Sequence, residues 1–251
     1  MASRVAEFRW TSATRSDVGR VRDDNEDSVF TQPESGVFVV ADGMGGHAAG
    51  EVASAIASRT IGDSACRRCG SIEALSEQLV GAFLEAGREI ARQAEEDPSR
   101  AGMGTTATVL RLRRDGQFLI AHIGDSRAYL SRDGQFTRVT RDHSWVQEQI
   151  DRGLLAPDKA AGHPQSNIIT RALGTDPSPT PDLYPGELKP GDVFLLATDG
   201  LTDMLTETEI AGLLGTGGSL EHIADALVAR ANRAGGVDNV TVLLVRVEEA
   251  A

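Results

Sequence analysis

Cysteine is scarce in this chain of 251 residues, which contains two, and both lie in one short stretch, Cys66-Arg67-Arg68-Cys69. A structural zinc site would require two more ligands at matching spacing, and no second pair of cysteines exists to provide them. A thioredoxin-like redox motif would begin a helix directly after a strand, whereas this pair follows a long alanine-rich segment with helical character. We therefore expect two incidental thiols near a helix end.

Long apolar runs are absent as well. The chain has no apolar run long enough to span a bilayer, and its first residues contain no signal segment. Lys and Arg (25) are outnumbered by Asp and Glu (37), and the net charge of -12 argues against nucleic acid as the partner. We expect a cytoplasmic protein that binds neither membranes nor nucleic acids. No linker, low-complexity block or repeat divides the chain, so one domain over residues 1–251 is predicted.

The hydrophobic pattern predicts strands joined by tight turns, together with blocks of helix. Asp-Gly turns at 114–116 and 132–134 are typical of β-hairpins, so antiparallel pairing is expected. Strands are expected at residues 36–41, 105–113, 116–123, 126–131, 135–139, 192–198 and 239–247. Helical periodicity occurs at residues 48–62, 72–96, 144–152, 207–214 and 219–234. Because strands come in runs rather than in strict alternation with helices, the pattern favours an α+β sandwich of antiparallel sheets covered by helices.

A glycine-rich stretch, VFVVADGMGGHAAGE at residues 37–51, combines a β-rich apolar run with one central acid, Asp42. Residues 43–48 satisfy the G-x-G-x-x-A pattern of dinucleotide-binding proteins, so a nicotinamide-dependent enzyme is an alternative. Two features count against it: no second strand with a ribose-binding acid follows, and Asp42 would place negative charge beside the pyrophosphate. A carboxylate at the mouth of a phosphate site is useful when a cation lies between them.

Further acids stand at the ends of other predicted strands. Asp125 follows one strand, Asp199 follows another, and Asp238 precedes the last. Asp203 lies one helical turn beyond Asp199, on the same face if the segment is helical. Asn25-Glu26-Asp27 precedes a short apolar pair. If the strand ends meet, these acids form one cluster.

Each acid alone would fit a turn or a helix cap, which is the interpretation we adopt for Asp115 and Asp133. A convergent cluster is different, because uncompensated carboxylates raise one another's pKa sharply. Hard divalent cations with oxygen ligands, such as Mg²⁺ or Mn²⁺, are the usual compensation. The pattern therefore indicates a divalent-metal site, on the condition that the acids converge.

Seven segments, in order along the chain, are similar to the motifs of one enzyme family. They are GRVRDDNEDS (19–28), ADGMGGHAAGE (41–51), GMGTTATV (102–109), GDSRAYL (124–130), HPQSNIITRALG (163–174), ATDGLTDML (197–205) and DNVTVLLV (238–245). Together they resemble the metal-dependent serine/threonine protein phosphatases of the PP2C (PPM) family in their compact bacterial form. The resemblance implies a four-layer α-β-β-α sandwich of two antiparallel sheets flanked by helices, with a binuclear Mn²⁺/Mg²⁺ centre at one edge.

The resemblance also assigns roles to residues. Asp42 corresponds to the acid that bridges both metals, and Gly43 to a residue whose carbonyl oxygen binds the second metal. Asp199 and Asp238 correspond to ligands of the first metal. The remaining counterparts are Glu26 and Asp27 for acids at or behind the metal-bound waters, Arg22 for the arginine that clamps the substrate phosphate, and Asp125 with Asp203 for the ligands of a third, weaker metal.

The reaction implied by the resemblance is hydrolysis of phosphoserine and phosphothreonine in proteins, by direct attack of a hydroxide that bridges two divalent metals. Bacterial relatives oppose serine/threonine kinases. Phosphorylated proteins, including such a kinase, are therefore the expected partners of a monomeric enzyme. The alternative is a catalytically silent phosphoprotein-binding module of the same fold, which is disfavoured because all the core acids are present.

The chain departs from the family pattern at two places. Met44 stands where eukaryotic relatives have a histidine thought to protonate the leaving group, and His47 lies three residues on. The proton source stays open between His47, a metal-bound water and the substrate. In the flap implied for residues 146–172, Ser166 stands where relatives often have arginine, while Arg171 is kept. This second departure concerns substrate preference rather than chemistry.

Overall fold

Two antiparallel sheets pack face to face in the computed structural model, which describes residues 8–45, 49–160 and 162–250. The first sheet has the order β1-β11-β10-β7-β8, with bounds Phe8–Asp17, Val240–Glu249, Val193–Ala197, Arg127–Arg132 and Gln135–Arg138. The second has the order β2-β3-β5-β6-β9, with bounds Asp27–Gln32, Val37–Met44, Ala107–Leu112, Gln117–Ile123 and Asp182–Glu187. A short strand, β4 (Gly104–Thr105), pairs with the end of β3.

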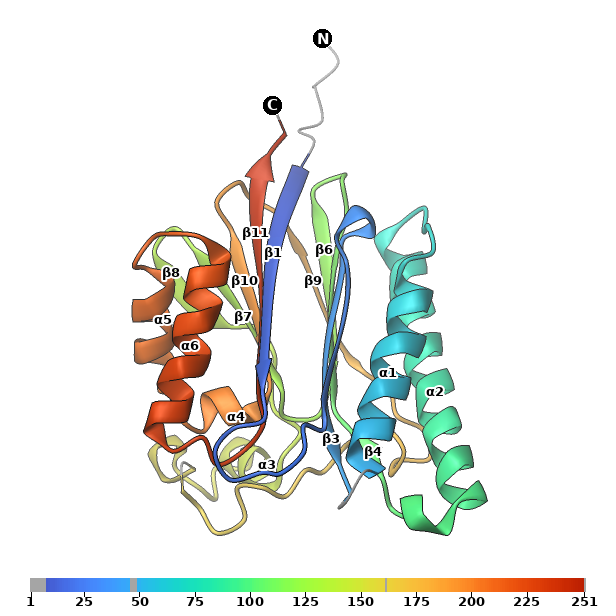
Figure 1. Ribbon diagram of the computed structural model, residues 1–251. Coiled ribbons are helices and arrows are strands. Elements are labelled where there is room, and N and C mark those ends of the chain that lie inside the picture. The colour runs from blue at the N-terminus through green and yellow to red at the C-terminus, as the bar shows by residue number, and fades with distance from the viewer. Residues whose placement is uncertain (1–7, 46–48, 161, 251) are drawn as a thin grey trace.

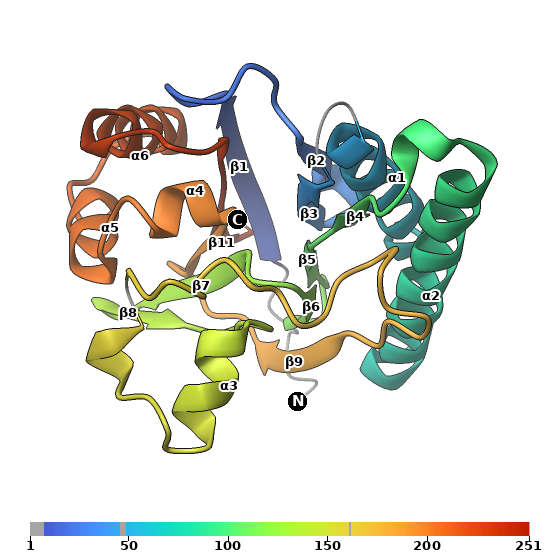
Figure 2. The ribbon, with the colours of Figure 1, turned by 90° about the horizontal axis from the view of Figure 1, so that it is seen from below.

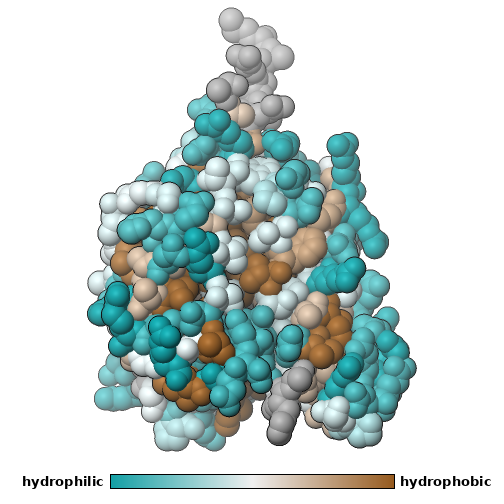
Figure 3. Space-filling model, viewed as in Figure 1, coloured by the Kyte–Doolittle hydropathy of each residue, from teal (hydrophilic) through white to brown (hydrophobic). Residues whose placement is uncertain are grey.

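Helices cover the outer face of each sheet, which gives four layers (Figure 1). The second sheet carries α1 (Ala49–Ala65) and α2 (Ile72–Glu96), and the first carries α4 (Asp199–Thr202), α5 (Glu207–Leu214) and α6 (Leu220–Ala234). A further helix, α3 (Trp145–Asp151), lies near the lower end of the molecule in Figure 1. Hydrophilic residues cover much of the outer helical surface in Figure 3. Within the described ranges, none of the helices has the length and apolar character needed to cross a bilayer.

Strand β3 shows how the layers are joined. Its first five residues are fully buried, because successive side chains point to opposite faces and both faces are covered. Val37, Val39 and Ala41 belong to the core between the second sheet and its helices. Phe38 and Val40 belong to the core between the two sheets. A continuous apolar run therefore ends at one edge of a well-packed structure, directly before Asp42.

The strands and helices expected from the hydrophobic pattern are confirmed, with ends that differ by at most three residues over the described ranges. Three longer strands were missed: β1, β2 and β9. All three are edge strands of their sheets. Edge strands expose polar side chains and tolerate proline, as β9 does at Pro185, so their apolar periodicity is weak.

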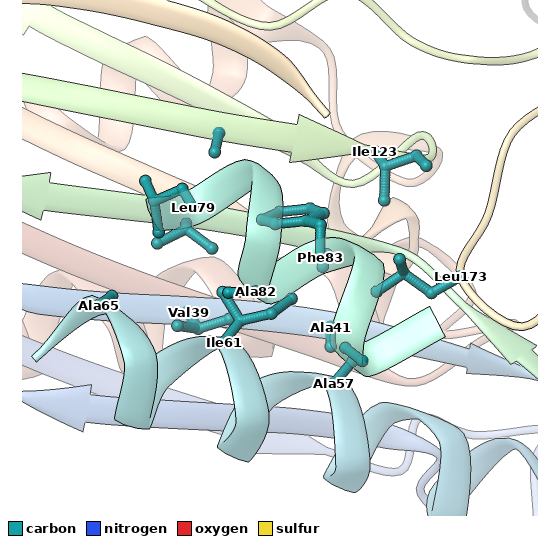
Figure 4. Packing of buried hydrophobic residues seen from close by; sticks show 14 of the residues in the cluster. Val39, Ala41, Ala57, Ile61, Ala65, Leu79, Ala82, Phe83, Ile123 and Leu173 are labelled. Atoms are coloured by element: carbon teal, nitrogen blue, oxygen red, sulfur yellow. The ribbon is translucent and has the colours of Figure 1, made fainter. Parts of the chain in front are cut away.

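The packing of α1 and α2 on the second sheet generates a stability prediction (Figure 4). Phe83 of α2 is fully buried in the same cluster as Ile61 of α1 and Val39 of β3. Phe83→Ala should lower the free energy of unfolding by about 3–5 kcal/mol, because a large cavity replaces the ring. Glu85→Ala, on the exposed face of the same helix, should change it by less than about 0.5 kcal/mol. Urea unfolding of both variants checks this, and equal losses would contradict it.

Candidate metal centre

The predicted site acids meet at one end of the sheets, the lower end in Figure 1 and the face seen in Figure 2. Asp42 lies near the end of β3, and Asp27 lies opposite it in the register of β2 with β3. Asp199 begins α4 directly after β10, Asp238 precedes β11, and Asp125 lies in the turn between β6 and β7. The two sheets thus contribute acids to the same edge, which meets the condition that the sequence pattern set for a divalent-metal site.

Thr106 anchors the backbone of Asp42 and was not among the predicted site residues. Its N–H donates to the carbonyl oxygen of Asp42 (2.9 Å), and its hydroxyl accepts from the N–H of Asp42 (2.9 Å). The same hydroxyl lies 2.7 Å from the hydroxyl of Ser126, beside Asp125. One neutral side chain therefore ties the end of β3 to the β6–β7 turn. Thr106 lies in the GMGTTATV motif, which is the signal that sequence reasoning could have used.

Asn239 performs a similar task on the other side of the site. Its side-chain oxygen accepts from the N–H of Glu26 (2.8 Å), and its amide nitrogen donates to the carbonyl oxygens of Val18 (3.0 Å) and Asp24 (2.9 Å). Asn239 follows Asp238 directly and is nearly buried. The loop that carries Arg22 and Glu26 is therefore fixed to the start of β11 by one amide.

Gly43 must be glycine for reasons of space. A Cβ atom there would lie 2.1 Å from the carbonyl oxygen of Gly50 and 2.7 Å from that of Glu26. The N–H of Gly43 donates to the carbonyl oxygen of Glu26 (3.1 Å). At Gly50, a Cβ would lie 2.7–2.9 Å from the Glu26 carboxyl group. The glycines therefore let β3, α1 and the Glu26 loop approach one another closely.

Burial and mutual repulsion dominate the electrostatics of the site. Burial, and then the charge of Asp199, raises the pKa of Asp42 well above its ordinary value. Burial, and then the charge of Asp203, raises the pKa of Asp199 to about 6. Burial raises the pKa of Asp27 to about 7, although hydrogen bonds from two threonines oppose the shift. Burial, and then the charge of Asp199, also raises the pKa of Asp125 well above its ordinary value.

Several of these carboxylates have an unsatisfied oxygen. The Oδ1 atoms of Asp27, Asp125 and Asp199 are buried and have no hydrogen-bond donor among the residues that the structure describes. A cation satisfies such oxygens and reverses the repulsion between their carboxylates. Over the described ranges, no three His, Cys, Asp or Glu side chains form a ready ligand cage. The donors present therefore fit a hydrated hard cation that also uses carbonyl oxygen and water, rather than a site built from side chains alone.

Arg22 lies at the outer rim of the acid cluster. Its Nη2 donates to Oδ2 of Asp238 at 2.7 Å, and its side chain is 52% exposed. The hydrogen bond from Arg22 to Asp238, and then the charge of that carboxylate, raises the pKa of the guanidinium. Arg22 is therefore a fixed positive group that faces both the acids and solvent, where it can meet an incoming anion.

Asp125 and Asp203 both line a cavity of about 820 Å³ between the β6–β7 turn, α4 and the segment from 144 to 167. The predicted helical spacing is confirmed, because Asp203 is the C-cap of α4 and its N–H donates to the carbonyl oxygen of Asp199 (2.8 Å). Burial raises the pKa of Asp203 as well. These two acids thus border the same water-accessible space beside the main cluster.

An ion pair on the wall of this cavity was missed by sequence reasoning. Arg127 donates from Nε and Nη2 to both carboxylate oxygens of Asp142 at 2.7–3.1 Å, and Asp142 is 5% exposed. The charge of Arg127 opposes the raised pKa of Asp125, while that of Asp142 adds to it. Arg127 belongs to the GDSRAYL motif, which is the signal that could have predicted it.

The segment 146–172, expected to be a flap, begins within α3, and contacts at its two ends hold these ends together. The N–H of Trp145 donates to the carbonyl oxygen of Ile168 (2.8 Å), and Arg171 pairs with Asp182 (2.9 Å). Arg171 therefore serves the base of this segment rather than the acid cluster. Ser166 lies on the wall of the cavity.

Four other residues are singled out by the sequence: Met44, His47, Cys66 and Cys69. Met44 is the last residue of β3, and the predicted alternative proton donor His47 lies outside the described residues. Cys66 and Cys69 are half-buried free thiols after the end of α1. Their incidental role stays a prediction.

The chain is similar to known proteins in both sequence and fold. A family model described as Protein phosphatase 2C matches residues 13–239. The chain is similar to serine/threonine phosphatase Stp of Listeria monocytogenes, with 39% identity over 92% of this chain and 93% of that protein. The crystal structure of Mycobacterium tuberculosis serine/threonine phosphatase PstP/Ppp superposes with a TM-score of 0.89 at 39% identity, covering 96% of this chain and 99% of that one. The catalytic domain of PstP in complex with two manganese ions gives a TM-score of 0.85 at 37% identity, covering 96% and 100%.

The raised pKa values predict an unusual pH dependence for the metal-free protein. An acid whose pKa rises on folding does not destabilise the fold while it is protonated. This is the case at a pH below its pKa in the unfolded chain, which is about 4. The destabilisation develops as the pH rises toward the folded value, about 7 for Asp27. Asp42→Asn removes one of the repelling charges, so in EDTA at pH 8 it should melt above wild type, by about 2–4 °C per kcal/mol relieved.

This difference should shrink toward pH 4, and saturating Mn²⁺ should reverse the order because wild type gains more from the cation. Asp133→Asn is the matched control, since this exposed turn acid lies outside the cluster. Thermal melts of the three proteins over the pH range make the comparison. A metal-free Asp42→Asn protein that melts below wild type at pH 8 would contradict the repulsion.

Proposed function

The chain belongs to the protein phosphatase 2C family and is a metal-dependent serine/threonine protein phosphatase, and we propose that the acid cluster at the sheet edge carries its activity. The observation that supports this assignment most is the convergence of buried carboxylates with unsatisfied oxygens, from both sheets, beside one exposed arginine. We propose further that residues 1–251 act as a single catalytic domain in which residues 146–172 form the flap.

We assign the metal-holding groups to both sides of the cluster. Asp42 would bind both of two cations. Asp199 and Asp238 would also bind the first cation, and the carbonyl oxygen of Gly43 would also bind the second. The structure of the PstP catalytic domain contains two manganese ions, which supports Mn²⁺, with Mg²⁺ as the chemical alternative. When bound, such cations offset the charge of a phosphate and lower the pKa of water enough to supply hydroxide near neutral pH.

The protein's own groups bind and orient the phosphate. Arg22 presents a planar fork of donors that suits two phosphate oxygens, and it holds its charge at every relevant pH. Its contact with Asp238 keeps the side chain near the site before substrate arrives, so less conformational entropy is lost on binding.

Glu26 and Asp27 act behind the cations. The carboxyl group of Asp27 is held by the hydroxyl of Thr198 at 3.0 Å, and its pKa of about 7 lets it hold a proton near neutral pH. Burial raises the pKa of Glu26, although the N–H of Gly50 opposes this by donating to it. We assign both acids the task of orienting water in the site.

Asp125 and Asp203 are assigned to a third, weaker cation site. Two carboxylates leave most of an octahedral coordination shell to water, which makes for weak binding. The cavity that both acids line has room for such a hydrated ion. The expected substrates are phosphoserine and phosphothreonine in proteins, among them a serine/threonine kinase.

The central test is loss of turnover without loss of fold. Asp42→Asn and Asp238→Asn should each reduce Mn²⁺-dependent hydrolysis of p-nitrophenyl phosphate to background, while circular dichroism stays native, because these acids serve cations rather than the core. Asp133→Asn again provides the control and should retain full activity. Near-normal turnover in either site variant would refute the assignment. Wild-type protein without any phosphatase activity would instead favour a silent phosphoprotein-binding module.

Arg22→Ala should separate substrate binding from metal binding. The loss of a charge-assisted contact should raise KM and lower kcat/KM on the order of 10- to 100-fold. Affinity for Mn²⁺ should change little, since Arg22 carries no donor oxygen. Arg20→Ala, an exposed arginine two residues away, is the matched control. Steady-state kinetics and calorimetric Mn²⁺ titration together decide, and loss of tight Mn²⁺ binding in Arg22→Ala would show that its role is structural.

Asp125→Ala should spare the tight Mn²⁺ sites and slow turnover substantially, because only the weaker cation is affected. Asp115→Ala, in the neighbouring β5–β6 turn, is the control for a pure turn acid. Melting temperature and Mn²⁺-titrated turnover are measured on both variants. If Asp125→Ala lowers the melting temperature but keeps full kcat, Asp125 is a turn residue and leaves the site.

A further inference from the structure

His143 joins the turn that carries Asp125 to the base of the flap. Its backbone N–H donates to the carbonyl oxygen of Gly124 (2.7 Å), and its carbonyl oxygen accepts from the N–H of Thr170 (2.8 Å). Gly124 directly precedes Asp125, and Thr170 lies at the end of the segment 146–172. The main chain of one residue thus contacts both structures.

The imidazole repeats this connection with its side chain. The N–H of Gly124 donates to Nδ1 of His143 at 3.0 Å, and the side chain is 1% exposed. A neutral imidazole that accepts at Nδ1 must carry its proton at Nε2. Nε2 lies 3.1 Å from Oδ2 of Asp182, which is an acceptor. Burial lowers the pKa of His143, although the hydrogen bond with Asp182 opposes the shift, so the ring is neutral at physiological pH.

Asp182 also binds the last arginine of the flap. Nη1 of Arg171 lies 2.9 Å from Oδ1 of Asp182 and 2.7 Å from Nε2 of His143. Two N–H groups cannot donate to each other, so the 2.7 Å distance between Nη1 of Arg171 and Nε2 of His143 is not a hydrogen bond. The two groups lie close together because both donate to the carboxylate of Asp182. Asp182 is therefore the shared acceptor of the flap base and of the imidazole that supports Gly124.

The turn at Gly124 has little freedom to adjust. Its φ is +106°, and a Cβ atom there would lie 2.5 Å from the side chain of Thr106. Thr106 in turn holds both main-chain polar groups of Asp42. The turn is consequently held between Thr106 on one side and His143 on the other. A change at either support moves the backbone that presents Asp125.

We propose that His143 is a positioning residue that couples the base of the flap to Asp125, through the series Arg171–Asp182–His143–Gly124. The state of the flap then sets how well Asp125 is placed for its cation. This inference rests on the proposed assignment of Asp125 to the weaker metal site. It adds a link between the segment that borders the cavity and the chemistry at the sheet edge.

The test follows the Gly124 amide in metal-free protein, which requires no activity. His143→Phe removes the ring contacts with Gly124 and Asp182. It should reduce the hydrogen-exchange protection of the Gly124 amide by about tenfold or more, because a hydrogen bond that contributes about 1.4 kcal/mol corresponds to a tenfold change. His143→Asn places a carbonyl oxygen near the Nδ1 position and should restore much of the protection. Asp182→Asn, which leaves the imidazole in place, should give an intermediate loss and covers the case in which His143→Phe does not fold.

The control is Asp192→Asn, which disturbs the ion pair of the buried Asp192 carboxylate with Arg132, at the opposite end of the first sheet. It should leave Gly124 protection relative to global stability unchanged. In the loaded enzyme, His143→Phe and Asp182→Asn should both require more Mn²⁺ for half-maximal turnover, whereas Asp192→Asn should not.

Unchanged Gly124 protection in both His143→Phe and Asp182→Asn would overturn the inference, whatever their activity. Reduced protection with an unchanged Mn²⁺ requirement would overturn the coupling to Asp125 in the same way. Failure of the proposed function is distinguishable, because it would appear as wild-type protein without Mn²⁺-dependent turnover.

Discussion

Repulsion among buried carboxylates is the constraint on which the arrangement of the rest of the site depends. Burial raises the pKa of the acids at the sheet edge, and the charge of a neighbouring acid, such as Asp199 beside Asp42, raises it further. Folding therefore brings together groups that resist it unless cations or protons intervene. A net charge of -12 gives no general relief, and Arg22 pairs with Asp238 only at the rim. Divalent cations held by these acids, as we propose, would remove the repulsion and supply the reactivity at the same time.

The fold holds the acids in place with neutral groups. Thr106 fixes the backbone of Asp42, Thr198 binds Asp27, and Asn239 holds the Glu26 loop. A hydroxyl or amide adds no charge, so these groups set the geometry of the cluster and leave its negative charge unchanged. Hydrophobic packing also fixes the position of the acids, because the strands that end at the site are buried in two cores. Positioning and charge are thus assigned to different side chains.

The sequence predicts the acids better than it predicts their supports. Asp42, Asp125 and Asp199 follow apolar strands, and strand ends that share a sheet edge converge, so their clustering follows from pattern and family resemblance. The supports depend on contacts that only the completed topology creates: the bond between Asp42 and Thr106 spans 64 residues and that between Glu26 and Asn239 spans 213. Edge strands such as β1 were not predicted because many of their side chains are exposed or only partly buried, so their apolar pattern is weak.

Proton release on metal binding tests the central claim most directly. Acids with raised pKa values must lose protons when a cation takes their oxygens. Calorimetric titration of metal-free protein with Mn²⁺, in buffers of different ionisation enthalpy, measures binding and proton release together. The account predicts two tight sites and net proton release at pH 6, falling as the pH rises above 7. Tight binding with no proton release at pH 6, or no tight binding at all, would contradict it.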